Sequence, residues 1–474
     1  MSKQNKKFPN VREWLGVPYA RAERFKKPTL LPYDASQAYD QSGPAAMQTV
    51  SVNWLTTDKG LSEDCLNLSI WAPERVTEPL PVVVYTHGGG WTIGSNTQDT
   101  SDLSGLVSSG KVIGVAINYR LGALGWLSLS QYGGALKDAT NLGLQDIVVA
   151  LQWIQENIAQ FGGDPKQVTL TGHSAGAYNS LALLGVKGTQ GLFHRIVAFS
   201  GFPSRYVPRW FAEELADRTL KKLQLDNPEE LLSVDAETLL NATMSCLDKD
   251  PIRLHALDNR NIGMVADWDL PNGVFARNPY EVIASGERSD IDILISSTTY
   301  EVGWYVLYGG KDLSIGGLDA LVDELVEYFH VPRLQAEKIV QFHYQEGMPF
   351  DELRALIYTS FSFTLPATRS LLNHAKAGGR AYQLNIGPAQ GALAVHGTEM
   401  YGIVGQEAPN ASQEQKERDQ FVSQTVLNMA LGQFDQLWTP VTELVEVKDI
   451  GQRPFESNTY IPEILNLFEG VQRT

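Results

Sequence analysis

The middle of the chain alternates short apolar runs with longer amphipathic segments. Residues 81–89 (PVVVYTHGG) open with a β-branched run that stops at glycines, and residues 111–119 (KVIGVAINY) contain a second such run. Runs of this length and composition are typical of strands that are buried on both faces of a parallel sheet. We therefore predict two parallel strands at these positions.

The segment from Asn141 to Gly162 has the period of a helix. Its apolar residues form a single stripe at positions i, i+3, i+4, i+7 and i+11, namely Ile147, Ala150, Leu151, Ile154 and Ile158. The two glycines at 162–163 favour the end of the helix, and Asp164-Pro165 favours a turn. The pattern predicts a long amphipathic helix followed by a turn.

The alternation continues toward the C-terminus. It predicts one more helix at 175–185 and four more strands, at 167–174, 194–201, 290–297 and 380–387. Strands that alternate with helices indicate an α/β fold, with a mostly parallel central sheet flanked by helices. The stretches at about 205–285 and 305–376 are mainly helical in pattern. We interpret them as insertions over the sheet of one catalytic domain that spans residues 1–474.

Composition narrows the class of protein. The 474 residues are 43% hydrophobic and 19% charged, which is typical of a globular protein, and the formal net charge is −16. So acidic a balance disfavours nucleic acid and anionic membranes as partners. No apolar run is long enough for a membrane span, and none follows the basic N-terminal residues as in a secretory signal. Two distant cysteines, Cys65 and Cys246, also favour a cytoplasmic protein.

A candidate nucleophile lies between a predicted strand and a predicted helix. Gly172-His173-Ser174-Ala175-Gly176 is a G-x-S-x-G motif. A sharp strand-to-helix turn lifts the serine hydroxyl out of the sheet, and glycines on both sides avoid a collision. The new helix directs its N-terminal amides toward the reacting centre. A bare motif of this kind is more often an ordinary Gly-Ser turn, but its flanking elements favour a catalytic serine.

A second glycine-rich motif, HGGGW (87–91), follows the apolar run at 81–86. Attack on an ester carbonyl produces an oxyanion, which needs fixed N–H donors about 3 Å away. Consecutive glycines let the backbone approach and turn its amides inward. We assign the amides of Gly89, Gly90 and Ala175 as these donors. The alternative is a phosphate-binding loop, but the motif has neither Gly-Lys-Ser/Thr nor dinucleotide spacing.

These two motifs and their surroundings resemble the type-B carboxylesterase family, which includes the cholinesterases. The matching segments occur in the family's order over most of the chain: GVPYA (16–20), SEDCLNLSIWAP (62–73), HGGGWTIGS (87–95), NYRLGALGWLS (118–128), residues 141–184, RIVAFSG (195–201), SSTTYEVGW (296–304) and GALAVHGTEM (391–400). The resemblance implies an α/β-hydrolase fold and an esterase activity.

The resemblance also implies the other two catalytic residues. The family's acid is a glutamate just after a strand, here Glu301, and its base is the histidine of a His-Gly-x-Glu motif, here His396. The order Ser174, Glu301, His396 is that of α/β hydrolases. In such a triad the histidine takes the serine proton and later returns it to the leaving alcohol, while the glutamate orients the imidazole. We expect neither a metal nor a cofactor.

Other residues remain alternatives for the same roles. His87 and His173 lie inside the motifs, where we expect them to shape the loops. The alternative acids are Asp267, Asp269 and Glu399. Glu399 is three residues from His396, a spacing that favours a structural contact.

The resemblance further implies residues that support the site. It implies structural ion pairs of Arg120 with Asp164 and of Arg24 with Glu63, and it implies that Ser200 supports the hydrogen bonds of the triad. We also expect aromatic side chains to line the acyl and alcohol pockets, with these candidates: Trp91, Phe199, Phe202, Phe361 and Phe363.

The chain departs from the family pattern at three places. The segment GPAAMQ (43–48) has no cysteine where many secreted relatives have one, so we expect Cys65 to be free. The shortened loop ARAERF (20–25) predicts a more open entrance to the site. The N-terminus begins almost at GVPYA, so we expect the preceding edge strands to be truncated or absent.

The sequence therefore predicts a serine carboxylesterase that hydrolyses small to medium neutral esters through an acyl-enzyme intermediate. We expect a monomer whose partners are the ester substrate and water. A hydrolase of amides or longer-chain lipid esters is the enzymatic alternative. A non-catalytic cholinesterase-like binding module is the other alternative, although such modules usually lose a triad residue and this chain keeps all three.

Overall fold

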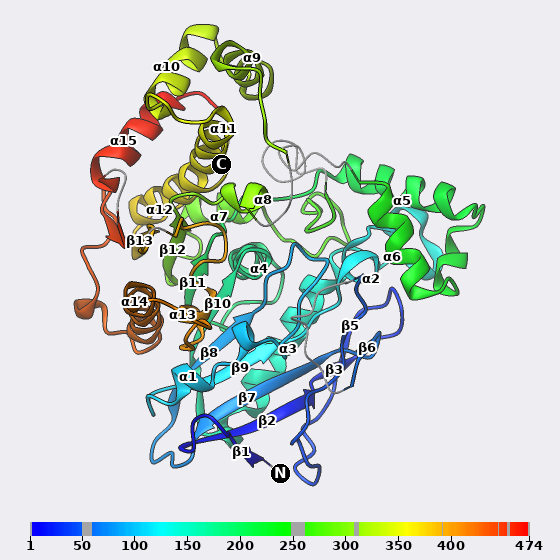
Figure 1. The fold of residues 1–474 in the computed structure, drawn as a ribbon. Helices are drawn as coiled ribbons and strands as arrows, with labels where there is room; N and C mark the ends of the chain where they lie inside the picture. Colours follow the sequence, from blue (N-terminus) through cyan, green and yellow to red (C-terminus); the bar gives the residue numbers. More distant parts are fainter. Residues whose placement is uncertain are drawn as a thin grey trace.

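A mixed sheet forms the centre of the computed structural model, which describes residues 2–49, 59–247, 261–307, 312–390, 392–443, 445–452 and 456–472. Within these residues the sheet has ten strands in the order β1-β2-β7-β9-β8-β10-β11-β12-β13-β14 (Figure 1). Their bounds are β1 (Lys3–Gln4), β2 (Val11–Pro18), β7 (Asn67–Pro73), β8 (Leu80–Thr86), β9 (Ile113–Ile117), β10 (Gly163–His173), β11 (Arg195–Phe199), β12 (Asp292–Thr298), β13 (Ala381–Ile386) and β14 (Val447–Ile450).

Most neighbouring strands of this sheet are parallel. The pairs from β9–β8 through β13–β14 are parallel, and the pairs β1–β2, β2–β7 and β7–β9 are antiparallel. Two small sheets lie outside it and join β3 (Ala20–Arg21) with β4 (Thr29–Leu30) and β5 (Ala45–Ala46) with β6 (Leu61–Ser62). The predicted α/β fold with a mostly parallel central sheet is confirmed.

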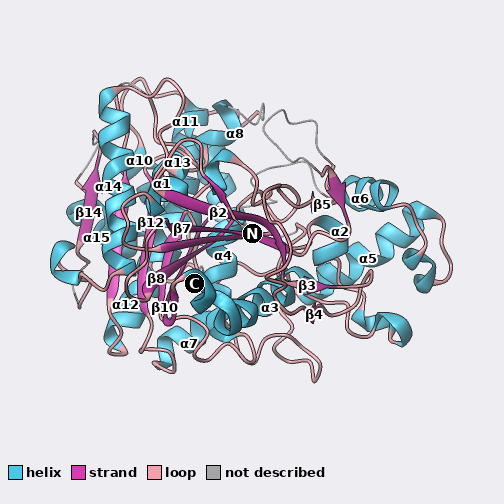
Figure 2. Ribbon diagram, turned by 90° about the horizontal axis from the view of Figure 1, so that it is seen from below, coloured by secondary structure: helices cyan, strands magenta, loops and turns pink. Residues whose placement is uncertain are grey.

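Helices cover both faces of the sheet because side chains alternate between the faces along each strand. On β8, Val82 and Val84 pack in the core formed with α3 (Leu142–Asn157), α4 (Ala175–Ala182) and α12 (Leu365–Lys376). Val83 and Tyr85 pack in the opposite core, which is covered by α1 (Ser104–Val107), α13 (Met400–Ile403) and α14 (Gln413–Ala430). Figure 2 shows the strands enclosed between helices.

The elements of the central region follow the predicted pattern. The apolar runs at 81–89 and 111–119 form β8 and β9, and the helix predicted from Asn141 is α3. All five residues of its apolar stripe are buried. After a 3₁₀ turn the chain leaves the helix at Gly162, whose φ of 87° lies in the left-handed region that favours glycine.

The two predicted insertions are largely helical. The first contains α5 (Arg209–Leu223), α6 (Ala236–Ser245) and α7 (Pro279–Ser285), and the second contains α8 (Gly303–Leu307), α9 (Leu318–Phe329), α10 (Arg333–His343), α11 (Phe350–Thr359) and a π-helix (Ser360–Thr364) that leads into α12. In Figure 1, α5 and α6 project from one side of the sheet. On the other side α10 lies beside α15 (Ser457–Leu467), and α9 and α11 pack against α10. Residues 248–260 and 308–311 of the insertions lie outside the described residues. The hydrophobic core of the sheet continues into α9 and α11, which supports a single domain, and this division stays a prediction.

The preceding edge strands are present, so the expectation that they are absent is wrong, while β1 is only two residues long. β2 is an eight-residue strand that pairs antiparallel with β7, and β1 extends the sheet beyond it. A bulge between Trp14 and Val17 shifts the register of β2, and this interrupts the alternation of apolar and polar residues by which a strand is recognised.

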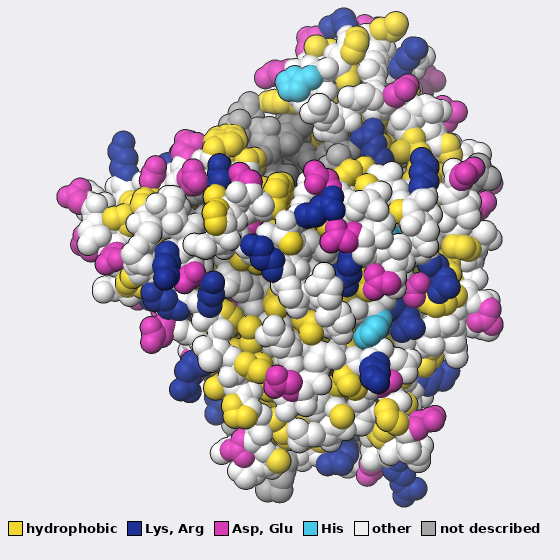
Figure 3. Space-filling model, turned by 180° about the vertical axis from the view of Figure 1, so that it is seen from behind, with side chains coloured by type: hydrophobic (Ala, Val, Ile, Leu, Met, Phe, Trp, Pro, Cys, Tyr) yellow, Lys and Arg dark blue, Asp and Glu magenta, His cyan; other side chains and the backbone are white. Residues whose placement is uncertain are grey.

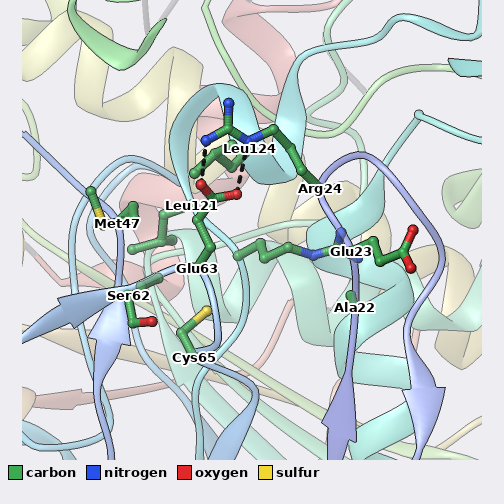
Figure 4. A pocket seen from close by; sticks show the side chains of 11 residues that line it. Ala22, Glu23, Arg24, Met47, Ser62, Glu63, Cys65, Leu121 and Leu124 are labelled. Atoms are coloured by element: carbon green, nitrogen blue, oxygen red, sulfur yellow. Dashed lines mark hydrogen bonds and ion pairs between the residues drawn. The ribbon is translucent and has the colours of Figure 1, made fainter. Parts of the chain in front are cut away.

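The predicted ion pair of Arg24 with Glu63 is present. Arg24 Nε donates to Glu63 Oε2 at 2.9 Å, and Arg24 Nη2 contacts the other carboxylate oxygen. Figure 4 shows this pair at the wall of a small pocket that Cys65 and Leu121 also line. This prediction is confirmed.

Arg120 has a different partner from the one predicted. Its Nε and Nη2 donate to the two carboxylate oxygens of Asp146 on α3, at 2.8 and 2.6 Å. Asp164 lies at the start of β10, where its carboxylate accepts from the backbone of Lys166 and the side chain of Gln167, each at 2.9 Å. The Asp-Pro turn thus satisfies Asp164 locally, whereas α3 places Asp146 in the buried interior beside Arg120.

The described surface mixes both signs of charge. Acidic and basic side chains are interspersed on the face seen in Figure 3. No helix in the described ranges is long and apolar enough to cross a membrane. Cys65 is buried and Cys246 is partly buried, and both are free thiols, which confirms the prediction for Cys65.

A buried polar cluster joins α10 to the π-helix and α15. His343 Nδ1 lies 2.8 Å from the carbonyl oxygen of Ile339, and its Nε2 lies 2.9 Å from the hydroxyl of Ser360, which contacts the hydroxyl of Tyr460 at 3.1 Å. Because a carbonyl only accepts, Nδ1 carries the proton and Nε2 accepts from Ser360. Burial lowers the pKa of His343 to about 4.

We expect Asp146→Ala to lower the free energy of unfolding by about 3–5 kcal/mol, because it leaves the buried Arg120 charge without its partner. Asp164→Ala is the matched control, and its effect should stay below about 1 kcal/mol because Asp164 makes only local surface contacts. Denaturant unfolding of both variants measures the difference. Equal losses in the two variants would contradict the assignment.

His343 should make the protein less stable in acid. Its folded-state pKa of about 4 lies below the ordinary histidine value, so the unfolded chain binds a proton first as the pH falls. We expect a loss of about 2 kcal/mol between pH 7 and pH 5 from this group. His343→Gln can still donate to Ile339 and accept from Ser360, and it should remove that part of the loss. His330→Asn, at an exposed position, serves as the control. Unchanged acid sensitivity in His343→Gln would disprove this account.

Candidate active site

Ser174 occupies the turn between β10 and α4. Its backbone has φ 54° and ψ −122°, a strained conformation for a residue with a side chain. A Cβ at Gly176 would lie 1.8 Å from the carbonyl oxygen of Thr86, and a Cβ at Gly172 would lie 2.6 Å from the carbonyl carbon of Gly176. Close packing of strand, turn and helix therefore requires both glycines, and the turn leaves Ser174 partly exposed.

The three predicted amide donors lie beside this turn. Gly89 and Gly90 have φ values of 109° and 60°, which favour glycine. A Cβ at Gly88 would come within 3.3 Å of Ser174 Cβ, so this loop packs directly against the serine. Ala175 is the first residue of α4, and its N–H has no acceptor within the helix. Among the described residues the amides of Gly89 and Gly90 also have no acceptor.

Glu301 and His396 are in contact although they lie 95 positions apart. They follow β12 and β13, so both reach the carboxyl edge of the parallel strands, as Ser174 does. His396 Nδ1 donates to Glu301 Oε2 at 2.6 Å, while the backbone N–H of Thr298 and the hydroxyl of Ser200 donate to Oε1 at 2.8 and 2.7 Å. These three donors fix the buried carboxylate, and they leave His396 Nε2 able to accept a proton.

The imidazole of His396 stands next to the serine turn. Its ring lies 4.5 Å from the ring of His173, the residue before Ser174. No hydrogen bond joins His396 to Ser174 within the described residues, and such bonds are often long in unliganded hydrolases and shorten when substrate binds. Burial lowers the pKa of His396, and the positive charge of Arg205 acts in the same direction. The imidazole is therefore neutral at neutral pH.

Ser200 links Glu301 to a second buried carboxyl group, that of Glu399. Its hydroxyl oxygen lies 2.7 Å from Glu301 Oε1 and 3.2 Å from Glu399 Oε1. One hydroxyl has one hydrogen, so both contacts are hydrogen bonds only if one carboxyl group is protonated. Burial raises the pKa of both glutamates, and the charge of Glu301 raises that of Glu399 further. Three donors hold Glu301 as a carboxylate, so Glu399 carries the proton.

The predicted aromatic residues fall into two groups, and the first lies near His396. The ring of Phe363 is 5.6 Å from that of His396, and Phe202 meets Phe363 edge-on at 6.1 Å. Trp91 follows the glycine loop and is buried, with its Nε1 donating to the side chain of Asn179 at 2.8 Å.

Phe199 and Phe361 do not lie in this group, contrary to the prediction. Phe199 packs in the core under α1 and α14, because strand residues next to each other point to opposite faces of the sheet. Phe361 stacks on Phe329 at 4.0 Å in the core of the second insertion. It lies two positions from Phe363, and helical residues at that spacing point to nearly opposite sides.

Three of the alternatives, Asp267, Asp269 and His87, lie in other surroundings. The carboxylate of Asp267 is buried and accepts hydrogen bonds from two backbone amides, and Asp269 forms a surface ion pair with Arg209. His87 stacks on Tyr119 at 4.5 Å. None of these contacts reaches Ser174, so the described geometry favours Glu301 and His396.

Sequence reasoning missed three neighbours of the site: Tyr178, Asn179 and Arg205. The guanidinium of Arg205 lies 5.4 Å from the ring of Trp91 and 5.0 Å from that of Tyr178. The small-residue start of α4 indicates a helix but not which side chains meet across it. Arg205 has no motif around it, so no sequence signal marks its position.

A strained serine at a strand-to-helix turn, a glycine loop against it and a buried glutamate–histidine pair at the same sheet edge define a serine-hydrolase site on an α/β-hydrolase fold. The model of the carboxylesterase family matches residues 1–434. The chain therefore belongs to the carboxylesterase family, and it is a carboxylic ester hydrolase.

Comparisons with individual proteins agree with this assignment. The chain is 33% identical over 345 residues to the para-nitrobenzyl esterase of Bacillus subtilis. This match covers 70% of this chain and 67% of that protein. It is 30% identical over 321 residues to mouse carboxylesterase 3B, covering 64% of this chain and 52% of that protein. The solved carboxylesterase EST55 of Geobacillus stearothermophilus superimposes with a TM-score of 0.81 at 27% identity over 97% of both chains. A solved PNB esterase gives 0.78 at 26% identity, over 94% and 93%.

We expect Ser200→Ala to lower kcat by about 10-fold or more, with a change in KM of less than about threefold, because it frees Glu301 on one side without altering the pocket. Glu399→Gln should lower kcat much less, since its amide can still donate to Ser200 as the protonated carboxyl does. Glu399→Leu removes the donor and is the matched comparison. Steady-state kinetics with a nitrophenyl ester measures all three. Equal losses for Gln and Leu would contradict the protonated state of Glu399.

Proposed function

We propose that catalysis in this carboxylesterase uses Ser174 as the nucleophile, His396 as the general base and Glu301 as the residue that orients it, with an oxyanion hole made by the amides of Gly89, Gly90 and Ala175. The single observation that supports this most strongly is the strained serine turn beside the hydrogen-bonded Glu301–His396 pair. This arrangement places a neutral base next to the serine turn, as nucleophilic catalysis requires.

The proposed reaction has two halves. In the first, Ser174 Oγ attacks the ester carbonyl carbon while His396 Nε2 takes the hydroxyl proton, and the oxyanion accepts hydrogen bonds from the three amides. The C–O bond to the leaving group breaks as His396 returns that proton to the alcohol. In the second half, His396 takes a proton from water while the water oxygen attacks the acyl carbon. The acyl C–O bond to Ser174 then breaks as His396 returns that proton to Ser174 Oγ, which releases the acid.

We also propose the class of substrate and the setting. The rings of Phe202 and Phe363 near His396 support small to medium neutral esters, since aromatic walls bind apolar groups without requiring charge. Two free thiols support a cytoplasmic location, because such thiols are typical of reducing compartments. We further propose that the protein acts as a monomer and that its partners are the ester substrate and water.

A fluorophosphonate probe tests the nucleophile. We expect the folded wild type to be labelled and Ser174→Ala to be neither labelled nor active, with a loss in kcat of at least about 10⁴-fold. Ser130→Ala, at a serine of the η2 turn (Ser130–Tyr132), is the control and should keep both labelling and activity. Thermal unfolding of each variant verifies folding. Labelling that persists in Ser174→Ala, or a folded wild type that is not labelled, would disprove the proposal.

A further inference from the structure

A second group of buried charged side chains lies behind the triad, where α13 packs against α14 (Figure 1). A Cβ at Gly402 of α13 would lie only 2.8 Å from the carbonyl oxygen of Asp419 on α14, so the two helices are in close contact at this point. Arg418, the residue before Asp419, is buried, and its Nη2 donates to the carbonyl oxygen of Thr398 at 3.3 Å. This contact places the guanidinium beside the chain segment that carries Glu399.

The polar atoms of this group are incompletely satisfied by hydrogen bonds. Within the described residues, Nε and Nη1 of Arg418 have no acceptor, and Oε2 of Glu399 and both carboxylate oxygens of Asp419 have no donor. The ion pair between Arg418 and Asp419 is loose, with Nη2 and Oδ1 3.5 Å apart. Buried polar groups without partners are rare and costly, so three such side chains at one helix contact need a physical explanation. Packing alone does not supply one, because apolar side chains would fill the same space at lower cost.

Arg418 supplies a positive charge that acts on Glu399. Burial raises the pKa of Glu399, the charge of Glu301 raises it further, and the charge of Arg418 lowers it. Tyr85 on β8 is also within electrostatic reach of Glu399, but burial raises the pKa of this tyrosine and keeps it neutral. His396, on the same loop as Glu399, is neutral as well. Arg418 therefore opposes the effects that keep the carboxyl group of Glu399 protonated.

We propose that Arg418 is a positioning residue for ester hydrolysis, and that its charge sets the pH at which Glu399 loses its proton. This inference rests on the proposed function, because Glu399 acts on the triad through Ser200. While Glu399 is protonated it donates to Ser200, whose own hydrogen then goes to Glu301. Once Glu399 is a carboxylate, two carboxylates compete for that one hydrogen. Glu301 then loses part of the support with which it orients His396.

Asp419 limits the effect of its neighbour Arg418. Burial raises the pKa of Asp419 to about 6, so this residue is a carboxylate at any pH above neutral. Its negative charge lies 3.5 Å from Arg418 Nη2 and offsets part of the positive charge. The two consecutive residues of α14 therefore have opposite effects on the proton of Glu399.

The pH dependence of kcat for a neutral nitrophenyl ester, measured between about pH 6 and pH 10, tests the inference because it reports ionisations in the enzyme–substrate complex. In the wild type kcat should fall at alkaline pH as Glu399 loses its proton, and Glu399→Gln should remove this fall. Arg418→Met should move the midpoint of the fall upward by about 0.5 pH unit or more, since without the positive charge Glu399 keeps its proton to higher pH. Arg418→Lys keeps the charge and should keep the midpoint near that of the wild type.

Two further variants separate the effect of charge from structural damage. Asp419→Asn leaves the charge of Arg418 unopposed and should move the midpoint downward, opposite to Arg418→Met. Arg288→Met is the matched control, because Arg288 is also buried but lies just before β12, at the edge of the sheet opposite the site, where it stacks on Phe193 at 5.0 Å. It should lower stability without moving the midpoint. Damage to packing lowers kcat at every pH, whereas a change of charge shifts the midpoint.

An alkaline fall that is missing in the wild type or that persists in Glu399→Gln would overturn the inference. So would an unchanged midpoint in folded Arg418→Met, or an equal shift in Arg288→Met. If Arg418→Met does not fold, Asp419→Asn decides, and an unchanged or higher midpoint in that variant would overturn the inference.

The proposed function fails separately from this inference. If Ser174→Ala keeps its activity, the proposed function is wrong. If activity requires Ser174 but the midpoint does not depend on Arg418, only this inference is wrong.

Discussion

The backbone at Ser174 is the constraint on which the rest of the site depends. A φ of 54° at a serine costs on the order of 1–3 kcal/mol and persists only because its surroundings allow no alternative. Those surroundings are β10 in the middle of the sheet, α4 packed on it, and Gly176 pressed against the carbonyl oxygen of Thr86. The packing of the sheet and of α4 thus offsets the strain that holds the Ser174 hydroxyl at the sheet edge.

The polar groups behind the triad follow from the same packing. Glu301 lies in a space from which water is excluded, so each of its oxygen contacts must come from the protein. Thr298 and His396 supply two donors, and Ser200 supplies a third while accepting from Glu399. Adding or removing one proton in this hydrogen-bond network changes the charge of the carboxyl groups next to the histidine. The orientation of His396, the proposed base, therefore depends on the fully buried carboxyl group of Glu399.

The sequence was sufficient for the fold class and for the candidate residues of the triad, because both leave local signals. Buried parallel strands are continuous apolar runs, and a nucleophile turn needs glycines at fixed positions. The remaining features depend on contacts between distant segments. The bulge in β2 interrupts the sequence pattern by which that strand would be predicted. Arg120 pairs with Asp146 rather than with Asp164 because the packing of α3 places Asp146 beside it.

The side-chain environment of the pocket was the least predictable part. Phe361 and Phe363 have the same residue type and are two positions apart, yet only Phe363 lies near His396. Arg205 has no motif around it, and its guanidinium lies over two rings that come from distant segments of the chain. Composition and periodicity describe which residues are buried, but they do not describe which buried residues meet.

A structure of the enzyme with a phosphonate ester bound is the most direct test of the central claim. Measured distances should show phosphorus bonded to Ser174 Oγ, with the phosphoryl oxygen about 3 Å from the amides of Gly89, Gly90 and Ala175 and with His396 Nε2 within hydrogen-bond distance of Ser174 Oγ or the leaving-group oxygen. Phosphorus on another residue, or a phosphoryl oxygen directed away from these amides, would contradict the account.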